Sequence, residues 1–379
     1  MATYDLDRTE LNHLLTPNID PSVRTAVLDY LYKELDSHSH DNDRGDKHSH
    51  DHDRGDNLDV QISDGTDALN PQADVLVLTS ADNSVTTDAN LKAIIENVAT
   101  DSTLDVSGTH SVFIAMGDGN DQVSLHDSGN DIVMMGKGDD TVFGGAGHDS
   151  IYGGAGNDLL VAGAGSHQLL EGGKGSDVLF GGSGAFDSLN GGAGADTLVA
   201  GTGEHQLLEG GKGSDVLYGG SGAFDSLFGG AGADTLMAGT GAHQLLFGGD
   251  GNDTLYGGEG AHDSLFGGAG NDVIHAGDGA NQLVDAGAGN DTIWAGSGGD
   301  SLFGGAGNDE FHIDSHHGND TVDGGSGENT IHFDTYASTD VKSIDTTGGT
   351  TIITFTDGQS ITATHIQDLV FTDGDHKLS

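Results

Sequence analysis

The sequence predicts an all-β solenoid in which short parallel strands coil around a thin core, and two observations lead to it. Units of nine residues with the pattern GGxGxDxUx, where U is a large aliphatic residue, repeat from about Gly117 to about Val322, and residues 153–161 (GGAGNDLLV) are a clean example. Glycines permit the positive φ angles of a tight turn, and the last three residues suit a short strand whose central aliphatic points inward. The chain also contains 66 glycines and only 34% hydrophobic residues, which suffices for a one-dimensional stack of rungs.

This repeat resembles the calcium-binding nonapeptide of the RTX, or haemolysin-type, family, and the resemblance covers somewhat more than half of the chain. It implies a parallel β-roll (a β-helix solenoid) that binds several Ca²⁺ ions. Members of the family are typically exported by the type I secretion machinery of Gram-negative bacteria through an uncleaved C-terminal signal, and they fold outside the cell when they meet calcium. Residues 361–379 occupy the place of such a signal. The repeats serve toxins, proteases, lipases and adhesins alike, so they do not indicate an activity.

The aspartates of the repeat explain the need for a metal ion. Two units make one turn, so every second aspartate lies on the same edge, about 4.8 Å above the last. Such a column repels itself, and calcium, which takes six to eight oxygen ligands, can bridge consecutive loops and cancel the repulsion. Folding and metal binding are therefore expected to be one event. The predicted ligands on this edge are Asp121, Asp140, Asp158, Asp177, Asp196, Asp215, Asp234, Asp253, Asp272, Asp291 and Asp309.

The opposite edge is predicted to bind calcium less well. From Ala162 onward its units have ten residues, because one residue is inserted before the ligand position, and that position alternates between amide and acid. An amide keeps an oxygen but loses the charge. The alternating positions are Gln168, Asp187, Gln206, Asp225, Gln244, Asp263 and Gln282, so the weaker candidates are Asp187, Asp225 and Asp263. In the nine-residue units of this edge the predicted ligands are Asp131, Asp149 and Asp300.

The inserted residues form a ladder, which we call the His/Phe ladder. Its members are His167, Phe186, His205, Phe224, His243, His262 and Asn281. Stacked side chains can hold these loops together in place of calcium, or the ladder is a site for a soft metal, haem or an aromatic ligand. Histidines two turns apart are about 9.5 Å apart, too far to share one ion, and within the ladder His243 and His262 are the pair on adjacent turns.

A second column follows the inward aliphatic residues of the nine-residue edge. It consists of Phe180, Val199, Tyr218, Met237, Tyr256, His275 and Trp294. These side chains are expected to point outward. They either pack against one another between rungs or form an apolar stripe that serves as a docking surface.

Residues 1–35 are predicted to be a helical N-terminal segment. Asp20 can cap a helix, and Pro21 suits its first position. One face is apolar and is expected to dock on the protein itself rather than on a partner or a membrane surface. This face contains Val23, Ala26, Val27, Tyr30, Leu31 and Leu35.

Residues 36–57 form a linker rich in histidine and aspartate, built from two copies of a ten-residue segment. Its histidines are His38, His40, His48, His50 and His52. Neutral imidazole binds borderline cations such as Zn²⁺, Ni²⁺ and Cu²⁺. The linker is therefore either a transition-metal trap or a solvated spacer.

The β-roll itself is predicted for residues 116–322, between two caps. In the N-terminal capping region, 58–115, residues 74–78 and 111–115 suit strands and residues 88–98 suit a short helix with Leu91, Ile94, Ile95 and Val98 inward. Residues 323–379 are expected to form a small β cap. Within them, residues 351–356 and 360–362 alternate around Asp357-Gly358, which is typical of a hairpin.

Charge and motifs exclude several functions. With 61 acidic against 12 basic residues, neither a nucleic acid nor an anionic membrane is an expected partner, and no apolar run is long enough to span a bilayer. Neither HExxH nor GxSxG occurs, so no enzymatic activity is expected. The prediction is a secreted, extracellular or cell-surface calcium-binding protein with a structural, surface or matrix role, acting with a cell-surface partner or by self-association. The alternative is an extracellular scavenger of a transition metal or haem, using the linker histidines and the His/Phe ladder.

Overall fold

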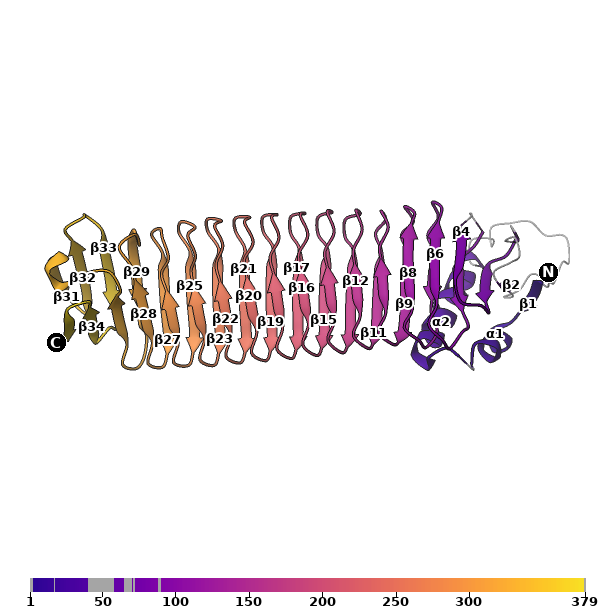
Figure 1. The fold of residues 1–379 in the computed structure, drawn as a ribbon, viewed down its shortest axis with the longest axis horizontal. Helices are drawn as coiled ribbons and strands as arrows, with labels where there is room; N and C mark the ends of the chain where they lie inside the picture. Colours follow the sequence, from indigo (N-terminus) through magenta and orange to yellow (C-terminus); the bar gives the residue numbers. More distant parts are fainter. Residues whose placement is uncertain are drawn as a thin grey trace. The chain divides into compact units, whose positions relative to one another are not determined.

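The structure is a computed structural model that describes residues 3–16, 18–39, 58–64, 70, 72–87 and 90–377. The residues form two units, Met1–Leu179 and Phe180–Ser379, which are described separately. Within each unit, successive rungs contribute short strands alternately to two parallel sheets, so each unit is a parallel β-solenoid (Figure 1). Among the described residues no helix is long and apolar enough to cross a membrane.

The first unit begins with a strand and two helices, and its strands then alternate between the two sheets. Its elements are β1 (Thr3–Leu6), α1 (Arg8–Leu15), α2 (Pro21–Ser39), β2 (Leu58–Ser63), β3 (Val75–Leu78), β4 (Asn83–Thr86), β5 (Ala93–Glu96), β6 (Thr103–Ser107), β7 (Phe113–Ala115), β8 (Gln122–His126), β9 (Ile132–Lys137), β10 (Thr141–Phe143), β11 (Ser150–Ala155), β12 (Leu159–Val161) and β13 (Leu169–Lys174), and β14 (Val178–Phe180) crosses into the second unit. One sheet runs β2-β3-β5-β7-β9-β11-β13, all parallel, with β1 antiparallel to β2. The other runs β4-β6-β8-β10-β12, also parallel.

The predicted helix after Asp20 is confirmed, and its apolar face docks on its own unit. Asp20 Oδ1 accepts a hydrogen bond from the Ser22 N–H at 2.8 Å, which satisfies a free donor at the start of α2. Val23, Val27 and Leu31 are buried in an apolar cluster with residues of α1, β2, β3, β5 and β7. Because this end of the sheet is covered by helices, its first rungs do not expose an apolar core.

Residues 58–115 differ from the prediction. They supply β2 to β7, which pair in parallel with one another. Through β6 and β7 they continue in parallel into the repeat strands β8 and β9. The helix predicted for 88–98 is wrong in its described part, because residues 93–96 form β5 between β3 and β7. All four residues of β5 are buried, and a short apolar run of this kind has no periodicity that separates helix from strand.

The second unit continues the same alternation and ends in antiparallel strands. Its elements are β15 (Ser188–Ala193), β16 (Thr197–Val199), β17 (Leu207–Lys212), β18 (Val216–Tyr218), β19 (Ser226–Ala231), β20 (Thr235–Met237), β21 (Leu245–Asp250), β22 (Thr254–Tyr256), β23 (Ser264–Ala269), β24 (Val273–His275), β25 (Leu283–Ala288), β26 (Thr292–Trp294), β27 (Ser301–Ala306), β28 (Glu310–Ile313), β29 (Asn319–Asp323), β30 (Thr330–Phe333), a 3₁₀ turn (Ser338–Asp340), β31 (Val341–Thr347), β32 (Thr350–Phe355), β33 (Ser360–Thr364), β34 (Asp368–Phe371) and β35 (Gly374–Lys377). The predicted hairpin around Asp357-Gly358 is confirmed as β32 and β33. β33 and β34 also pair in parallel with β29 and β30, so this tail forms a last rung.

The core of the repeat region is one aliphatic side chain per strand. In the second unit Leu208 of β17 and Leu217 of β18 are fully buried, and their neighbours along both sheets are equally inaccessible. The residues on either side of them in each strand are only half-buried or exposed. Such a core is thin, so burial alone offsets little of the entropy of ordering these glycine-rich turns.

Replacing Leu31 by alanine should loosen the helical end of the first unit. Leu31 is fully buried in the apolar cluster, and removing a buried leucine side chain costs roughly 2–5 kcal/mol. Amide exchange of residues 18–39 should rise markedly, measured by hydrogen–deuterium exchange mass spectrometry. Lys33→Ala, at an exposed position of the same helix, is the control. Equal exchange in both variants would show that the face does not stabilise the unit.

Candidate metal-binding site

Each nine-residue unit places an aspartate beside a gap in its own turn. In the turn that ends at Asp158, Gly154 and Gly156 have φ of 108° and 147°, a region that side chains rarely adopt. A Cβ on Gly153 would lie 2.3 Å from Asp158 Oδ2 and 2.8 Å from the carbonyl oxygen of Gly172 on the next rung. The first glycine of the motif therefore leaves room between a carboxylate oxygen and a backbone carbonyl oxygen.

One oxygen of each aspartate is engaged within the fold. In the first unit the Asp140 N–H donates to Asp158 Oδ1 at 2.9 Å. In the second unit the same bond links each aspartate from Asp196 to Asp309 with the aspartate one rung on, at 2.8 to 3.0 Å. The backbone thereby aligns the carboxylates in one column on each unit.

The second oxygen, Oδ2, is buried and lacks a hydrogen-bond donor. This is so for Asp140, Asp158, Asp215, Asp234, Asp253, Asp272, Asp291 and Asp309, each at most 1% exposed. At Gly210, Gly229 and Gly248 an added Cβ would lie 2.4–2.6 Å from this oxygen and 2.6–2.7 Å from a carbonyl oxygen of the next rung. Carbonyl oxygens cannot donate, so the column is a row of hard oxygen ligands without a counter-charge. This donor set fits Ca²⁺.

Burial raises the pKa values of the aspartates in the column. Burial, opposed by the backbone hydrogen bond from Asp140 and reinforced by the charge of Asp177, raises the pKa of Asp158 to about 7. In the second unit burial raises the pKa of Asp272 to about 7 and that of Asp215 to about 6, with neighbouring aspartates adding to the effect. Without a cation, these groups are therefore partly protonated near neutral pH.

The ten-residue edge satisfies its ligand positions with its own donors. The Gly201 N–H donates to Gln206 Oε1 at 3.0 Å, and Gln206 Nε2 donates to the Gly184 carbonyl at 2.8 Å. Gln244 repeats both bonds one super-repeat later, and Asp225 Oδ2 accepts from the Gly220 N–H at 3.3 Å. At the described ligand positions of this edge, four Oδ2 atoms have no donor: those of Asp131, Asp263, Asp300 and Asp320. The contrast with the nine-residue edge supports the predicted asymmetry.

The His/Phe ladder forms a row of ring contacts on strained turns, stacked from Phe186 to Phe224 and edge-on or tilted from Phe224 to His262. In the second unit its members from Phe186 to Asn281 have φ between 58° and 64°, which non-glycine residues adopt only where the surroundings enforce it. Centroids of successive rings from Phe186 to His262 lie 4.8 to 5.2 Å apart. In the first unit His148 and His167 are also neighbours, at 5.4 Å. These contacts favour the stacking interpretation.

The outward column is also a ring stack, and it is longer than predicted. Tyr256, His275 and Trp294 stack at centroid distances of 4.9 and 4.3 Å, and His312 and His332 continue the stack at 4.8 and 4.9 Å. The last two residues were missed, although each follows a buried residue of β28 or β30 just as the others follow their leucines. Lateral packing between rungs therefore accounts for these side chains.

Most of the predicted transition-metal residues lie outside the part of the chain that the structure describes. His38 lies in the last turn of α2, and His40, His48, His50 and His52 lie outside the described residues. Within the described ranges, no three side chains of histidine, cysteine, aspartate or glutamate are placed to hold one metal ion. Each candidate site therefore depends on backbone carbonyl oxygens beside one or two carboxylates.

Two polar groups at the C-terminal end were missed by the sequence analysis. Asp320, in the sequence GNDTV, carries the same signal as the other aspartates, and its Oδ1 accepts from the Asp300 N–H at 2.9 Å. The fully buried His317 places Nδ1 3.2 Å from Asp320 Oδ2. Burial raises the pKa of Asp320, and the contact with His317 opposes the shift. The His317 side chain therefore lies beside Asp320 Oδ2, whereas the Oδ2 atoms of the nine-residue edge lie beside backbone carbonyl oxygens.

The repeated glycine turns, the aspartate column and the two parallel sheets define a calcium-binding β-roll. The family of RTX calcium-binding nonapeptide repeats matches residues 135–166, 171–204, 205–223, 209–242, 247–283, 281–311 and 312–334, which together are just over half of the chain. The chain therefore belongs to the RTX calcium-binding repeat family, whose repeats bind Ca²⁺. No curated protein matches it.

Acid should partly replace calcium in folding this protein. The pKa values of Asp158, Asp215 and Asp272 are raised from 3.8 to about 6 or 7, so protonation favours the folded state. This stabilisation is fully present below about pH 4 and is lost as the pH rises through 6 to 7. Circular dichroism in excess chelator should show β structure near pH 4 and its loss by pH 7.5. A chain that is equally unfolded at both values would contradict the prediction.

Proposed function

We propose that this protein is exported unfolded and folds outside the cell as calcium fills the nine-residue edge of its roll, and that it then has a structural role at a surface or in a matrix. One observation carries the calcium assignment: the row of buried Oδ2 atoms without donors, each beside a backbone carbonyl oxygen. The ions would be held by Asp158 and Asp177 in the first unit. In the second unit they would be held by Asp196, Asp215, Asp234, Asp253, Asp272, Asp291 and Asp309.

Charge supports folding after export rather than before it. The chain has a formal net charge of −49, and the column concentrates this charge in buried positions. Where calcium is scarce, the carboxylates repel one another. Extracellular calcium-binding modules have dissociation constants of roughly 10⁻⁴–10⁻³ M. A chain with this affinity stays unfolded where calcium is micromolar or lower and folds where it is millimolar. The export partner that we propose is the type I secretion machinery, which the resemblance to the RTX family implies.

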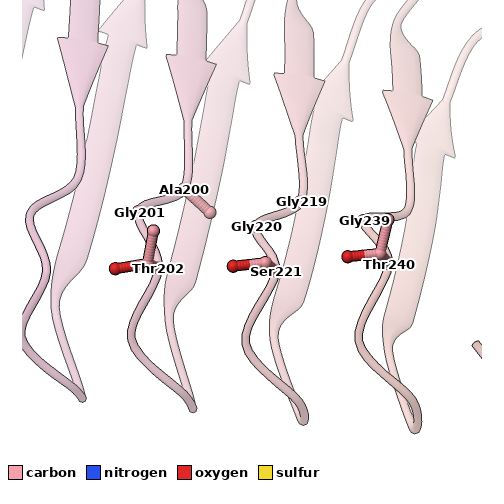
Figure 2. A pocket seen from close by; sticks show the side chains of 8 residues that line it. All are labelled: Ala200, Gly201, Thr202, Gly219, Gly220, Ser221, Gly239 and Thr240. Carbon is pink, nitrogen blue, oxygen red and sulfur yellow. The ribbon is translucent and has the colours of Figure 1, made fainter.

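The surface supports a structural rather than a catalytic role. A groove of about 390 Å³ on the ten-residue edge is lined by glycines, Ala200 and three hydroxyl side chains (Figure 2). The hydroxyls of Thr202, Ser221 and Thr240 project in the same direction from successive rungs. Neither a base nor a carboxylate lines the groove, so nothing in it activates a hydroxyl as a nucleophile. A regular hydroxyl row suits contact with a repetitive surface, including a second copy of this chain.

Calcium should drive folding at neutral pH. In excess chelator at pH 7.5 the repeat region should give a coil signal by circular dichroism, and millimolar calcium should produce the β signal cooperatively, because each ion joins two rungs. Magnesium at the same concentration is the control, since it demands octahedral geometry and gives up water reluctantly. A chain that is already folded in excess chelator at pH 7.5 would contradict the proposal.

The two edges should differ when their aspartates lose charge. Replacing both Asp215 and Asp234 by asparagine should raise the calcium midpoint by about tenfold, which corresponds to about 1.4 kcal/mol, because each change removes a charge beside an unpaired oxygen site. The matched change at Asp187 and Asp225 should shift the midpoint much less. Asp225 already accepts a backbone N–H at Oδ2, the oxygen that lacks a donor in Asp215 and Asp234. Equal shifts in the two variants would show that both edges bind calcium alike.

A further inference from the structure

We propose that the calcium column is shorter than the column of aspartates. It begins after Met135 in the first unit and ends at Asp309 in the second, and side chains of the protein close both ends. Asp121 and Asp140 match the motif but on this proposal hold no ion, although Asp140 Oδ2 lacks a donor as the Oδ2 atoms of the calcium rungs do. The inference rests on the proposed calcium binding of the nine-residue edge and specifies which of its rungs take part.

Strand register identifies the closing residues of the first unit. β9 and β11 pair Met134 with Tyr152 and Gly136 with Gly154, so Met135 stands in the place of Gly153. β7 and β9 pair Ala115 with Met134, so Met116 stands in that place one rung earlier. Both methionine side chains are fully buried. The motifs that end at Asp121 and Asp140 therefore begin with methionine where the calcium turns begin with glycine.

A methionine at this place removes the room for an ion. On the glycine rungs a Cβ would already lie 2.3–2.6 Å from the carboxylate oxygen, as at Gly153 and Gly210. The Oδ2 atoms of Asp291, on the turn that begins with Ala286, and of Asp140, on the turn that begins with Met135, both lack a donor, so the two rungs differ in the size of the side chain at this place. A methionine adds three further heavy atoms, all buried, and its thioether sulfur is a soft ligand that Ca²⁺ does not favour. These rungs are therefore held by apolar packing.

The second unit ends with a hydrogen bond in place of an ion. At Gly304 the atoms nearest to an added Cβ are Asp309 Oδ2, at 2.4 Å, and the carbonyl oxygen of the next rung, at 2.9 Å. One rung on, at Gly324, the corresponding atoms are Asn329 Nδ2 and the His365 carbonyl oxygen, both at 2.5 Å. Nδ2 donates to this carbonyl at 3.1 Å. An amide hydrogen thus does there what a cation would do on the preceding rungs.

The closed ends have a consequence for how the first unit responds to calcium. Its methionine rungs adjoin strands whose other side packs against α2, and the apolar cluster there needs no metal. This end is therefore ordered before calcium arrives and offers a template rung to the chain that follows. The aspartates that need an ion come only after it.

The number of bound ions tests the proposal directly. Native mass spectrometry of the full chain at pH 7.5 and saturating calcium gives the reference count. Met135→Gly should add one ion because it restores the gap beside Asp140. Asn329→Asp should also add one, because it replaces the donor with a second carboxylate oxygen at nearly constant volume. If Met135→Gly does not fold, Met135→Ala, which copies the residue found at Ala286, replaces it.

Two control variants separate a new site from a mere change of charge or packing. Met134→Ala alters the half-buried neighbour on the other face of β9 and should leave the ion count unchanged. Asn308→Asp adds a carboxylate at an exposed position of the turn that ends at Asp309 and should also add no ion. An unchanged count in both Met135 and Asn329 variants, with calcium bound to the parent chain, overturns the inference. No calcium on the parent chain would instead refute the proposed function.

Discussion

Stacked carboxylates of like charge, buried one per rung, constrain everything else in this protein. At a spacing of about 4.8 Å and an effective dielectric constant of about 20, two neighbouring charges repel by about 3 kcal/mol. The second unit has seven such aspartates in line, from Asp196 to Asp309, and burial adds to the cost of keeping them charged, as the raised pKa values of Asp215 and Asp272 show. The backbone N–H that each Oδ1 accepts offsets only part of it. A core of one aliphatic side chain per strand cannot supply the rest, so folding requires a counter-charge, either protons or a divalent ion.

The two edges of the roll solve this problem in different ways. On the nine-residue edge, glycine keeps most turns open and leaves Oδ2 beside carbonyl oxygens, which on the proposed function makes this edge dependent on a cation. On the ten-residue edge the inserted residue forces a positive φ, and the amides of Gln206 and Gln244 satisfy both the N–H and the carbonyl groups of their loops. Ring contacts from Phe186 to His262, stacked at first and then edge-on or tilted, join neighbouring loops. On the proposed function, metal dependence is therefore greater on the nine-residue edge, although the Oδ2 atoms of Asp263 and Asp300 on the other edge also lack a donor.

Much of the fold and of the candidate site could be predicted from the sequence, because each copy of the motif places the same residue types in the same turn and strand. The nine-residue spacing gave the parallel roll, the inward leucines and the aspartate column, and the inserted residues gave the second ladder. The failures lie where the repeat stops. Residues 93–96 are a short apolar run that fits helix and strand equally well, so only their pairing with β3 and β7 decides. Some motifs match the repeat but on the further inference hold no ion, because they contain Met116, Met135 or Asn329. The effect of these residues depends on which atoms meet across rungs, and the pattern of one chain segment does not contain that information.

The alternation of Gln and Asp on the ten-residue edge also bears on the register of the coil. On the nine-residue edge the rungs from Asp196 to Asp309 all carry an aspartate, so a chain that loops out one of these rungs while coiling would still stack aspartate on aspartate. On the other edge the loss of the rung with Gln244 would bring Asp225 directly against Asp263, where the structure now has an amide between two acids. Omitting two rungs restores the alternation at no such cost. Register errors of a single rung are therefore disfavoured during coiling. Register errors are tolerated only in steps of the 38-residue period and not in steps of the nine-residue motif.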